Sequence, residues 1–251
     1  MQNFSNAANR LLEQRYLQPG EDWEKLVTRN INAIVKYDIK LASEMFDLIN
    51  NRVFLPASPT LVNAGRNNGL FPCFTVGPTE DTLENSFNTL TEIALVAKKG
   101  GGCGFTGSVL RPKNSIVNGS AHGYAYGPNR FAEMVSYAMD AITQSVFRKM
   151  ALMYTLSAEH PDIEEFIHLK QTESEAACYN FNQSVMVKDN FINKALVDPV
   201  SKEGKLFDLI AKHAWNNGEP GLLFETTINE NTPYNQSGQL CLTTNPCSGK
   251  R

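Results

Sequence analysis

The sequence predicts an α/β protein whose first part is helical. Three apolar patterns with helical spacing occur within residues 5–50. From about residue 54 to the end, short apolar runs that suit strands alternate with helical patterns. Such alternation is typical of parallel strands joined by crossover helices. We therefore expect a helical region over residues 1–52 and an α/β region over residues 53–251.

The helical region divides at its turn residues. Apolar side chains between Ala8 and Tyr16 recur at helical spacing, and Pro19-Gly20 interrupts the run. A second helical pattern runs from Trp23 to Val35. A third runs from Ile39 to Ile49.

Residues 54–80 differ from the helical region because prolines and glycines punctuate short apolar pieces. We expect strands and turns here, including a strand at Cys73–Val76. Asp81 is a plausible N-cap, with Glu84 three residues later, for a helix over residues 83–99. Gly100-Gly101-Gly102 then ends this helix.

The remaining sequence continues the alternation. We expect strands over residues 105–110, 151–156, 179–187 and 221–224, the last of them buried, and helices over residues 129–145, 160–170, 191–195 and 206–216.

Composition excludes several classes of function. The net charge of −3 favours neither nucleic acid nor an anionic membrane as a partner. There is no run of 18 apolar residues and no secretion signal, so we expect a cytoplasmic protein without a membrane span. The five cysteines include no CxxC pair, which argues against a disulfide framework and against a metal site.

Two cysteines stand in informative contexts. Cys73 opens a predicted strand, and a buried strand thiol is the ordinary interpretation. Cys247 follows Asn245-Pro246, which favours a turn, so its thiol should be accessible and could be reactive or incidental. The glycines around Cys103 allow a close backbone approach to a ligand, but they suit a helix end equally well. Cys103, Cys178 and Cys241 have no partner at metal-ligand spacing.

Taken in order, ten short sequence blocks resemble one family, the large subunits of ribonucleotide reductases. Their sequences are most similar to the adenosylcobalamin-dependent branch. The matching blocks are Phe54–Gly65, Phe71–Phe74, Glu80–Glu84, Lys98–Phe105, Leu110–Lys113, Gly127-Pro128, His160–Ile167, Asn180–Val185, Gly218–Gly221 and Thr244–Cys247. Together they span about 200 residues.

The resemblance implies a ten-stranded α/β barrel of two five-stranded halves around a finger loop. Residues 53–251 would form the first half and end in that loop. Cys247 would carry the thiyl radical that abstracts the ribose 3′ hydrogen, and Asn245 would bind a ribose hydroxyl. Cys73 would be one of the two thiols that reduce the 2′ carbon. Substrate contacts would come from Ser58, Gly102, Cys103 and Gly104.

The resemblance also implies regulation and partners. Asp81 and Arg111 would belong to a nucleoside triphosphate effector site, and residues 171–178 would relay effector identity. The substrate would be a ribonucleoside di- or triphosphate, the cofactor adenosylcobalamin, and the reductant a dithiol protein such as thioredoxin. The assembled enzyme would be a homodimer.

The sequence departs from the family at its end. Gly249 stands where the family has a general-base glutamate, and residues 144–148 replace a glycine- and arginine-rich stretch. Cys241 precedes Cys247 by six residues on the same run, so it does not replace the second reducing thiol. We therefore expect the chain alone to be inactive and to need a second chain carrying the C-terminal half. A non-catalytic nucleotide-binding module and an inactive remnant of an interrupted gene are the alternatives.

Overall fold

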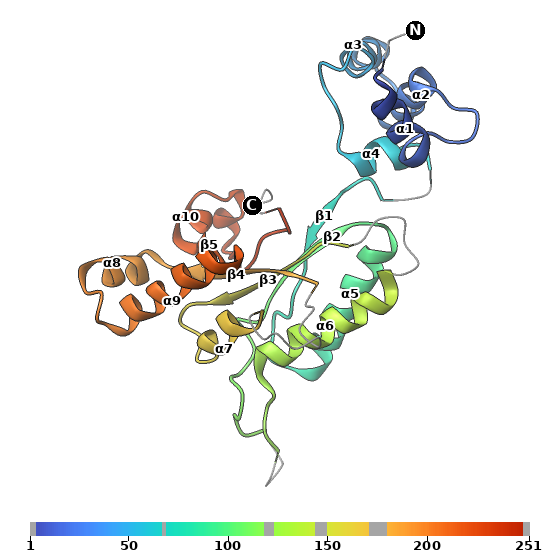
Figure 1. Cartoon of the computed structure of the whole chain (residues 1–251). Coiled ribbons are helices and arrows are strands. Elements are labelled where there is room, and N and C mark those ends of the chain that lie inside the picture. Colours follow the sequence, from blue (N-terminus) through green and yellow to red (C-terminus); the bar gives the residue numbers. More distant parts are fainter. Residues whose placement is uncertain (1–3, 67–68, 118–122, 144–149, 171–179, 248–251) are drawn as a thin grey trace. The chain divides into compact units, whose positions relative to one another are not determined.

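The computed structural model describes residues 4–66, 69–117, 123–143, 150–170 and 180–247. They form two compact units (Figure 1). The first comprises residues 1–72 and 99–101, and the second comprises the rest. The first unit thus extends past residues 1–52, which the sequence analysis assigns to the helical region.

The first unit is built from four helices, α1 (Asn6–Arg15), α2 (Trp23–Ile34), α3 (Ile39–Asn50) and α4 (Ser58–Asn63). The side chains of Ser5, Asp22 and Asp38 cap the first three by accepting backbone N–H bonds. Helix α4 was not expected, because the prolines and glycines of residues 54–80 suggested strands and turns. Pro59 lies in the first turn of α4, where a missing N–H costs no helical hydrogen bond.

The second unit contains a parallel sheet of five strands in sequence order. The strands are β1 (Cys73–Thr75), β2 (Gly102–Thr106), β3 (Leu152–Ser157), β4 (Asn182–Val187) and β5 (Gly221–Phe224). The helices are α5 (Leu83–Lys98), α6 (Gly127–Thr143), α7 (Ile163–His168), α8 (Asp189–Val197), α9 (Lys202–Asn217) and α10 (Glu225–Glu230). A 3₁₀ turn follows at Pro233–Ser237. The predicted alternation of strands and crossover helices is confirmed.

Alternate side chains of the strands enter the helix-covered core. Phe105 of β2, Tyr154 of β3 and Val185 of β4 pack there with side chains of α5, α6, α7, α8 and α9. Tyr154 lies at the centre, with its ring centroid 4.7 Å from that of Phe105, and its hydroxyl donates to the Pro128 carbonyl at 2.8 Å. Burial raises the pKa of Tyr154 well above its ordinary value. The strand residues between these side chains face the opposite side of the sheet.

Two expectations about strand position or burial were wrong. β2 begins at Gly102 rather than Phe105, and residues 107–110 form a turn instead of its end. β5 pairs only with β4 in the described sheet and leaves Phe224 47% exposed, so it is an edge strand and not a buried one. Helix α10 directly follows β5 and was not expected.

Candidate active site

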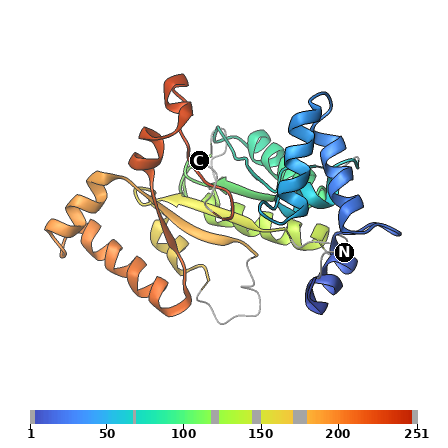
Figure 2. The ribbon, with the colours of Figure 1, turned by 90° about the horizontal axis from the view of Figure 1, so that it is seen from above.

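The C-terminal segment Leu242–Cys247, called the crossing segment below, lies over the sheet face opposite α5 and α6 (Figures 1 and 2). Hydrogen bonds from the sheet hold it. The Thr155 hydroxyl donates to the Leu242 carbonyl at 3.1 Å, and the Asn182 amide donates to the Pro246 carbonyl at 3.2 Å. In return, the Thr243 hydroxyl donates to the Phe105 carbonyl at 3.3 Å. The segment is therefore fixed across β2, β3 and β4.

Glycines in β2 make this crossing possible. A Cβ placed on Gly104 would lie 1.7 Å from the Thr244 carbonyl oxygen, which no side chain can tolerate. A Cβ on Gly102 would lie 3.1 Å from Pro246 Cγ. The two glycines alternate with Cys103 and so share one face of the strand. Their role in substrate contact stays a prediction. In this structure both glycines lie beneath the crossing segment.

The crossing segment brings two of the predicted cysteines together. Cys247 Sγ lies 4.0 Å from Cys73 Sγ, and the Asn245 amide donates to Cys247 Sγ at 3.7 Å. Cys73 and Asn245 are buried, whereas Cys247 is exposed. Three residues that the sequence analysis assigns to catalysis thus form one cluster, called the thiol cluster below.

Cys103 lies on the other face of the sheet. Its side chain belongs to the helix-covered core, and its register partner on β1 is Phe74 rather than Cys73. Burial raises the pKa of Cys103 to about 12, with smaller contributions from Cys73 and Glu92. A protonated, fully buried thiol is a poor nucleophile, so the structure supports the interpretation of Cys103 as a core thiol.

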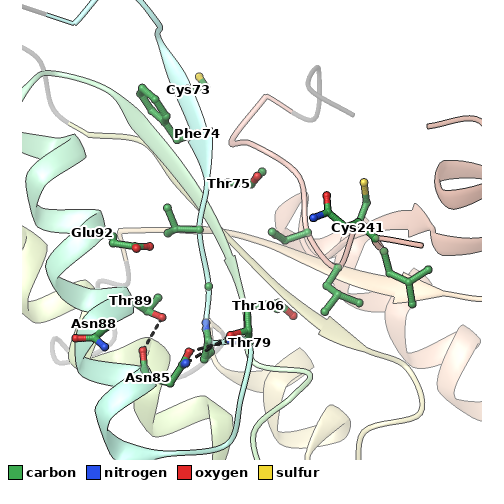
Figure 3. Close-up of a pocket in the computed structure, with 17 residues that line it drawn as sticks. Cys73, Phe74, Thr75, Thr79, Asn85, Asn88, Thr89, Glu92, Thr106 and Cys241 are labelled. Carbon is green, nitrogen blue, oxygen red and sulfur yellow. Dashed lines mark hydrogen bonds between the residues drawn. The ribbon is translucent and has the colours of Figure 1, made fainter. Parts of the chain in front are cut away.

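A cavity of about 850 Å³ runs beside β1 (Figure 3). Cys73 lines it from β1 and Cys241 from the stretch that leads into the crossing segment, while polar side chains such as Asn88 and Glu92 project from α5. The Asn229 side chain holds Cys241 by accepting its N–H at 2.7 Å and donating to its carbonyl at 3.2 Å. The cavity beside Cys73 is therefore lined by both apolar and polar groups, with Glu92 as the charged side chain among them.

Asp81 and Arg111 form an ion pair at the start of α5. The Arg111 Nε lies 2.5 Å from Asp81 Oδ2, and both side chains are about one third exposed. The expectation that Asp81 caps the helix was wrong, because the Thr82 hydroxyl accepts the Asn85 N–H at 3.2 Å instead. Asp81 is thereby left to pair with Arg111.

The remaining predicted residues lie elsewhere. Ser58 belongs to the first unit, where its hydroxyl lies 2.8 Å from that of Tyr16. Residues 144–148 and 171–178 and Gly249 lie outside the described residues. Among the side chains that the structure describes, no group of three or more His, Cys, Asp or Glu residues could hold a metal ion. None of the described helices is long and apolar enough to span a membrane.

Thr155 and Asn182 were not identified from the sequence, although both hold the crossing segment. Thr155 is a fully buried hydroxyl within the apolar run of β3. Such a polar residue inside a buried strand needs a hydrogen-bond partner, and this requirement could have indicated that Thr155 binds another segment. Asn182 opens β4 within a polar stretch and gave no comparable signal.

Comparisons with known proteins agree with this geometry. Residues 2–69 match the model of the ribonucleotide reductase all-alpha domain, and residues 72–200 match that of the ribonucleotide reductase barrel domain. The chain is 40% identical over 216 residues to the vitamin B12-dependent ribonucleoside-diphosphate reductase of Thermoplasma acidophilum, covering 80% of this chain and 28% of that one. It is 34% identical over 272 residues to the protein of the same name from Mycobacterium tuberculosis, covering 97% and 39%.

A solved structure shares the fold. The Actinobacillus ureae class Id ribonucleotide reductase alpha subunit superposes with a TM-score of 0.83 at 20% identity, over 97% of this chain and 45% of that chain. The chain thus spans less than half the length of these relatives.

Proposed function

Because the chain belongs to the ribonucleotide reductase family, we propose that its thiol cluster takes part in reducing ribonucleoside diphosphates to deoxyribonucleotides. The observation that carries this proposal is the approach of Cys247 to Cys73, at 4.0 Å, beside the Asn245 amide. The diphosphate follows the names of the Thermoplasma and Mycobacterium relatives.

In this proposal Cys247 abstracts the ribose 3′ hydrogen as a thiyl radical. Its S–H bond is weak enough to be broken and re-formed, and its exposed side chain can meet a substrate. Asn245 orients the sulfur and a ribose hydroxyl through its amide. Cys73 supplies one reducing thiol from the start of β1. Gly249 stands at the position of the family's general base, so that base is not supplied by this residue. The second reducing thiol belongs to the part of the reductases that these residues do not span.

The proposed cofactor is adenosylcobalamin, which supplies radical chemistry when it is bound. The described residues fit such chemistry in one respect: Cys247 is exposed, while Cys73 and Cys103 are buried. This chain's part is to present the exposed sulfur of Cys247 at a fixed place. The hydrogen bonds from Asn182 and Thr155 to the crossing segment supply the rigidity.

Regulation and assembly complete the proposal. Arg111, already beside α5, would bind an effector phosphate while Asp81 holds its guanidinium in place. The exposed face of α5 carries Leu83, Phe87 and Leu95, which are 70%, 51% and 57% exposed. These apolar side chains suit the packing of a second copy in a homodimer. A dithiol protein such as thioredoxin would re-reduce the cysteines.

The test is 3′-hydrogen exchange between substrate and solvent, measured on protein that contains these residues together with the rest of the barrel. We expect Cys247→Ser to abolish exchange, because an O–H bond is much stronger than an S–H bond. Cys73→Ser should retain exchange while sustained reduction is lost. Effector binding should survive in both variants. Equal exchange in the wild type and in Cys247→Ser would refute the proposed role of Cys247.

A further inference from the structure

Two thiols of different accessibility face each other at the thiol cluster. The distance of 4.0 Å between Cys73 Sγ and Cys247 Sγ exceeds the disulfide bond length of about 2.05 Å by roughly 2 Å. Cys247 lies in a turn at the end of the crossing segment. Closing this gap requires the two sulfurs to approach by roughly 2 Å, through rotation of the Cys247 side chain and a shift of its turn.

We infer that Cys73 and Cys247 also close as a reversible disulfide with each other, which keeps the radical-bearing sulfur out of use until a thiol restores it. The pair differs from the one expected for turnover, in which Cys73 is joined to a thiol outside these residues. The disulfide rests on the geometry alone, whereas its inhibitory consequence rests on the proposed function.

The reaction needs an oxidant, and a low-molecular-weight disulfide such as oxidised glutathione is sufficient. The exposed Cys247 thiolate attacks one sulfur of the oxidant and expels the first small thiolate, which leaves a mixed disulfide. The Cys73 thiolate then attacks Cys247 Sγ and expels the second. Two protein thiols lose two electrons in total, and the oxidant is reduced to two thiols. A dithiol reverses both steps.

The other described cysteines are poor competitors for this pairing. Cys103 is fully buried on the helix-covered face, and the raised pKa keeps it protonated. Cys241 is held through its backbone by Asn229, and its sulfur lies 3.8 Å from the Thr232 hydroxyl. The crossing segment, in contrast, presents Cys247 directly to Cys73. The geometry therefore selects one pair.

The experiment treats the 251-residue chain with oxidised glutathione and maps the linked peptides by mass spectrometry. We expect the loss of two free thiols per chain, recovery of the Cys73–Cys247 linked peptide, and its disappearance on treatment with dithiothreitol. Cys73→Ser should leave a lasting glutathione adduct on Cys247. Cys241→Ser is the matched control and should form the same linked peptide as the wild type.

Two results would overturn the inference: a glutathione adduct that persists on Cys247 of the wild type, or a dominant linked peptide that contains Cys241. The disulfide is detected without any turnover, so its failure is separate from failure of the proposed function. If reduced protein with the complete barrel exchanges the 3′ hydrogen and the oxidised protein exchanges it equally, the inhibitory role is wrong. Loss of exchange on oxidation, restored by dithiothreitol, supports it.

Discussion

The two ends of the parallel sheet differ in the interactions that position the segments packed against them. Toward the amino ends, the crossing segment lies against Gly102 and Gly104 and accepts a hydrogen bond from the neutral Asn182 amide. At the carboxyl ends of β3, β4 and β5, Lys188 lies 2.5 Å from Glu159, with Glu225 nearby. These charged residues line a second cavity of about 390 Å³.

This difference indicates where the fold should be most sensitive to substitution. Close backbone packing leaves no room for one added methyl group, so the position of the crossing segment over β2 depends on steric fit. The Lys188–Glu159 pair is about half exposed, and such pairs contribute little because water and salt screen them. The thiol cluster thus lies at the end of the sheet where one added side-chain carbon can displace the crossing segment. The charged end should tolerate substitution.

The largest expected effect is that of Gly104→Ala. The new Cβ would overlap the Thr244 carbonyl oxygen, so the crossing segment must move away. We expect a loss of about 3 kcal/mol or more in the free energy of unfolding, at the upper end of overpacking costs. A short bis-alkylating reagent should also bridge Cys73 and Cys247 more slowly.

Gly77→Ala is the matched control for Gly104→Ala. Its Cβ would meet the Thr106 nitrogen at 3.7 Å, an ordinary contact. Urea unfolding and the rate of bridging should therefore stay close to those of the wild type. If Gly104→Ala matched this control in both measurements, steric positioning of the crossing segment by β2 would be wrong.

A moderate effect is expected for Thr155→Val. The substitution keeps the shape of a fully buried side chain but removes the hydroxyl that bonds Leu242. Because the bond is only partly buried, its loss should cost about 1 kcal/mol of unfolding free energy. Thr155→Ser keeps the hydroxyl and should recover the bridging rate of Cys73 and Cys247. A Val variant as stable as the Ser variant would show that this hydrogen bond contributes nothing.

The sequence predicts the layout of the sheet unit because its signals are local. Short apolar runs indicated β3 and β4, and Gly100, with a φ of 76°, ends α5 as expected. The start of β2 was misplaced for a non-local reason. Gly102 and Gly104 look like turn residues, yet they lie in a strand. Glycine is needed there because the crossing segment, about 140 residues later, passes directly over them.

The candidate site divides in the same way. Cys73, Asn245 and Cys247 were identified through blocks that resemble a family, and periodicity alone would have left both cysteines as ordinary thiols. Their 4.0 Å contact depends on the fold of the intervening chain. The effector residues Asp81 and Arg111 do meet, but Asp81 was also assigned a capping role that Thr82 performs. Local capping rules do not take account of a partner such as Arg111, which is 30 residues away in the sequence.

The smallest expected effect is that of Lys188→Met at the charged end. The hydrogen bond to Glu159 is the main cause that raises the pKa of Lys188, with Glu225 and Glu159 charges adding to it against burial. Because the folded pKa lies above the ordinary value of 10.5, the stabilisation is fully present below pH 10.5 and is lost as the pH rises through the folded pKa. At neutral pH we expect Lys188→Met to lose less than about 1 kcal/mol of unfolding free energy. Lys188→Arg keeps the charge and serves as the control, and added salt should shrink the difference between the Met and Arg variants. A loss as large as that of Gly104→Ala, insensitive to salt, would mean that the two ends of the sheet do not differ as described.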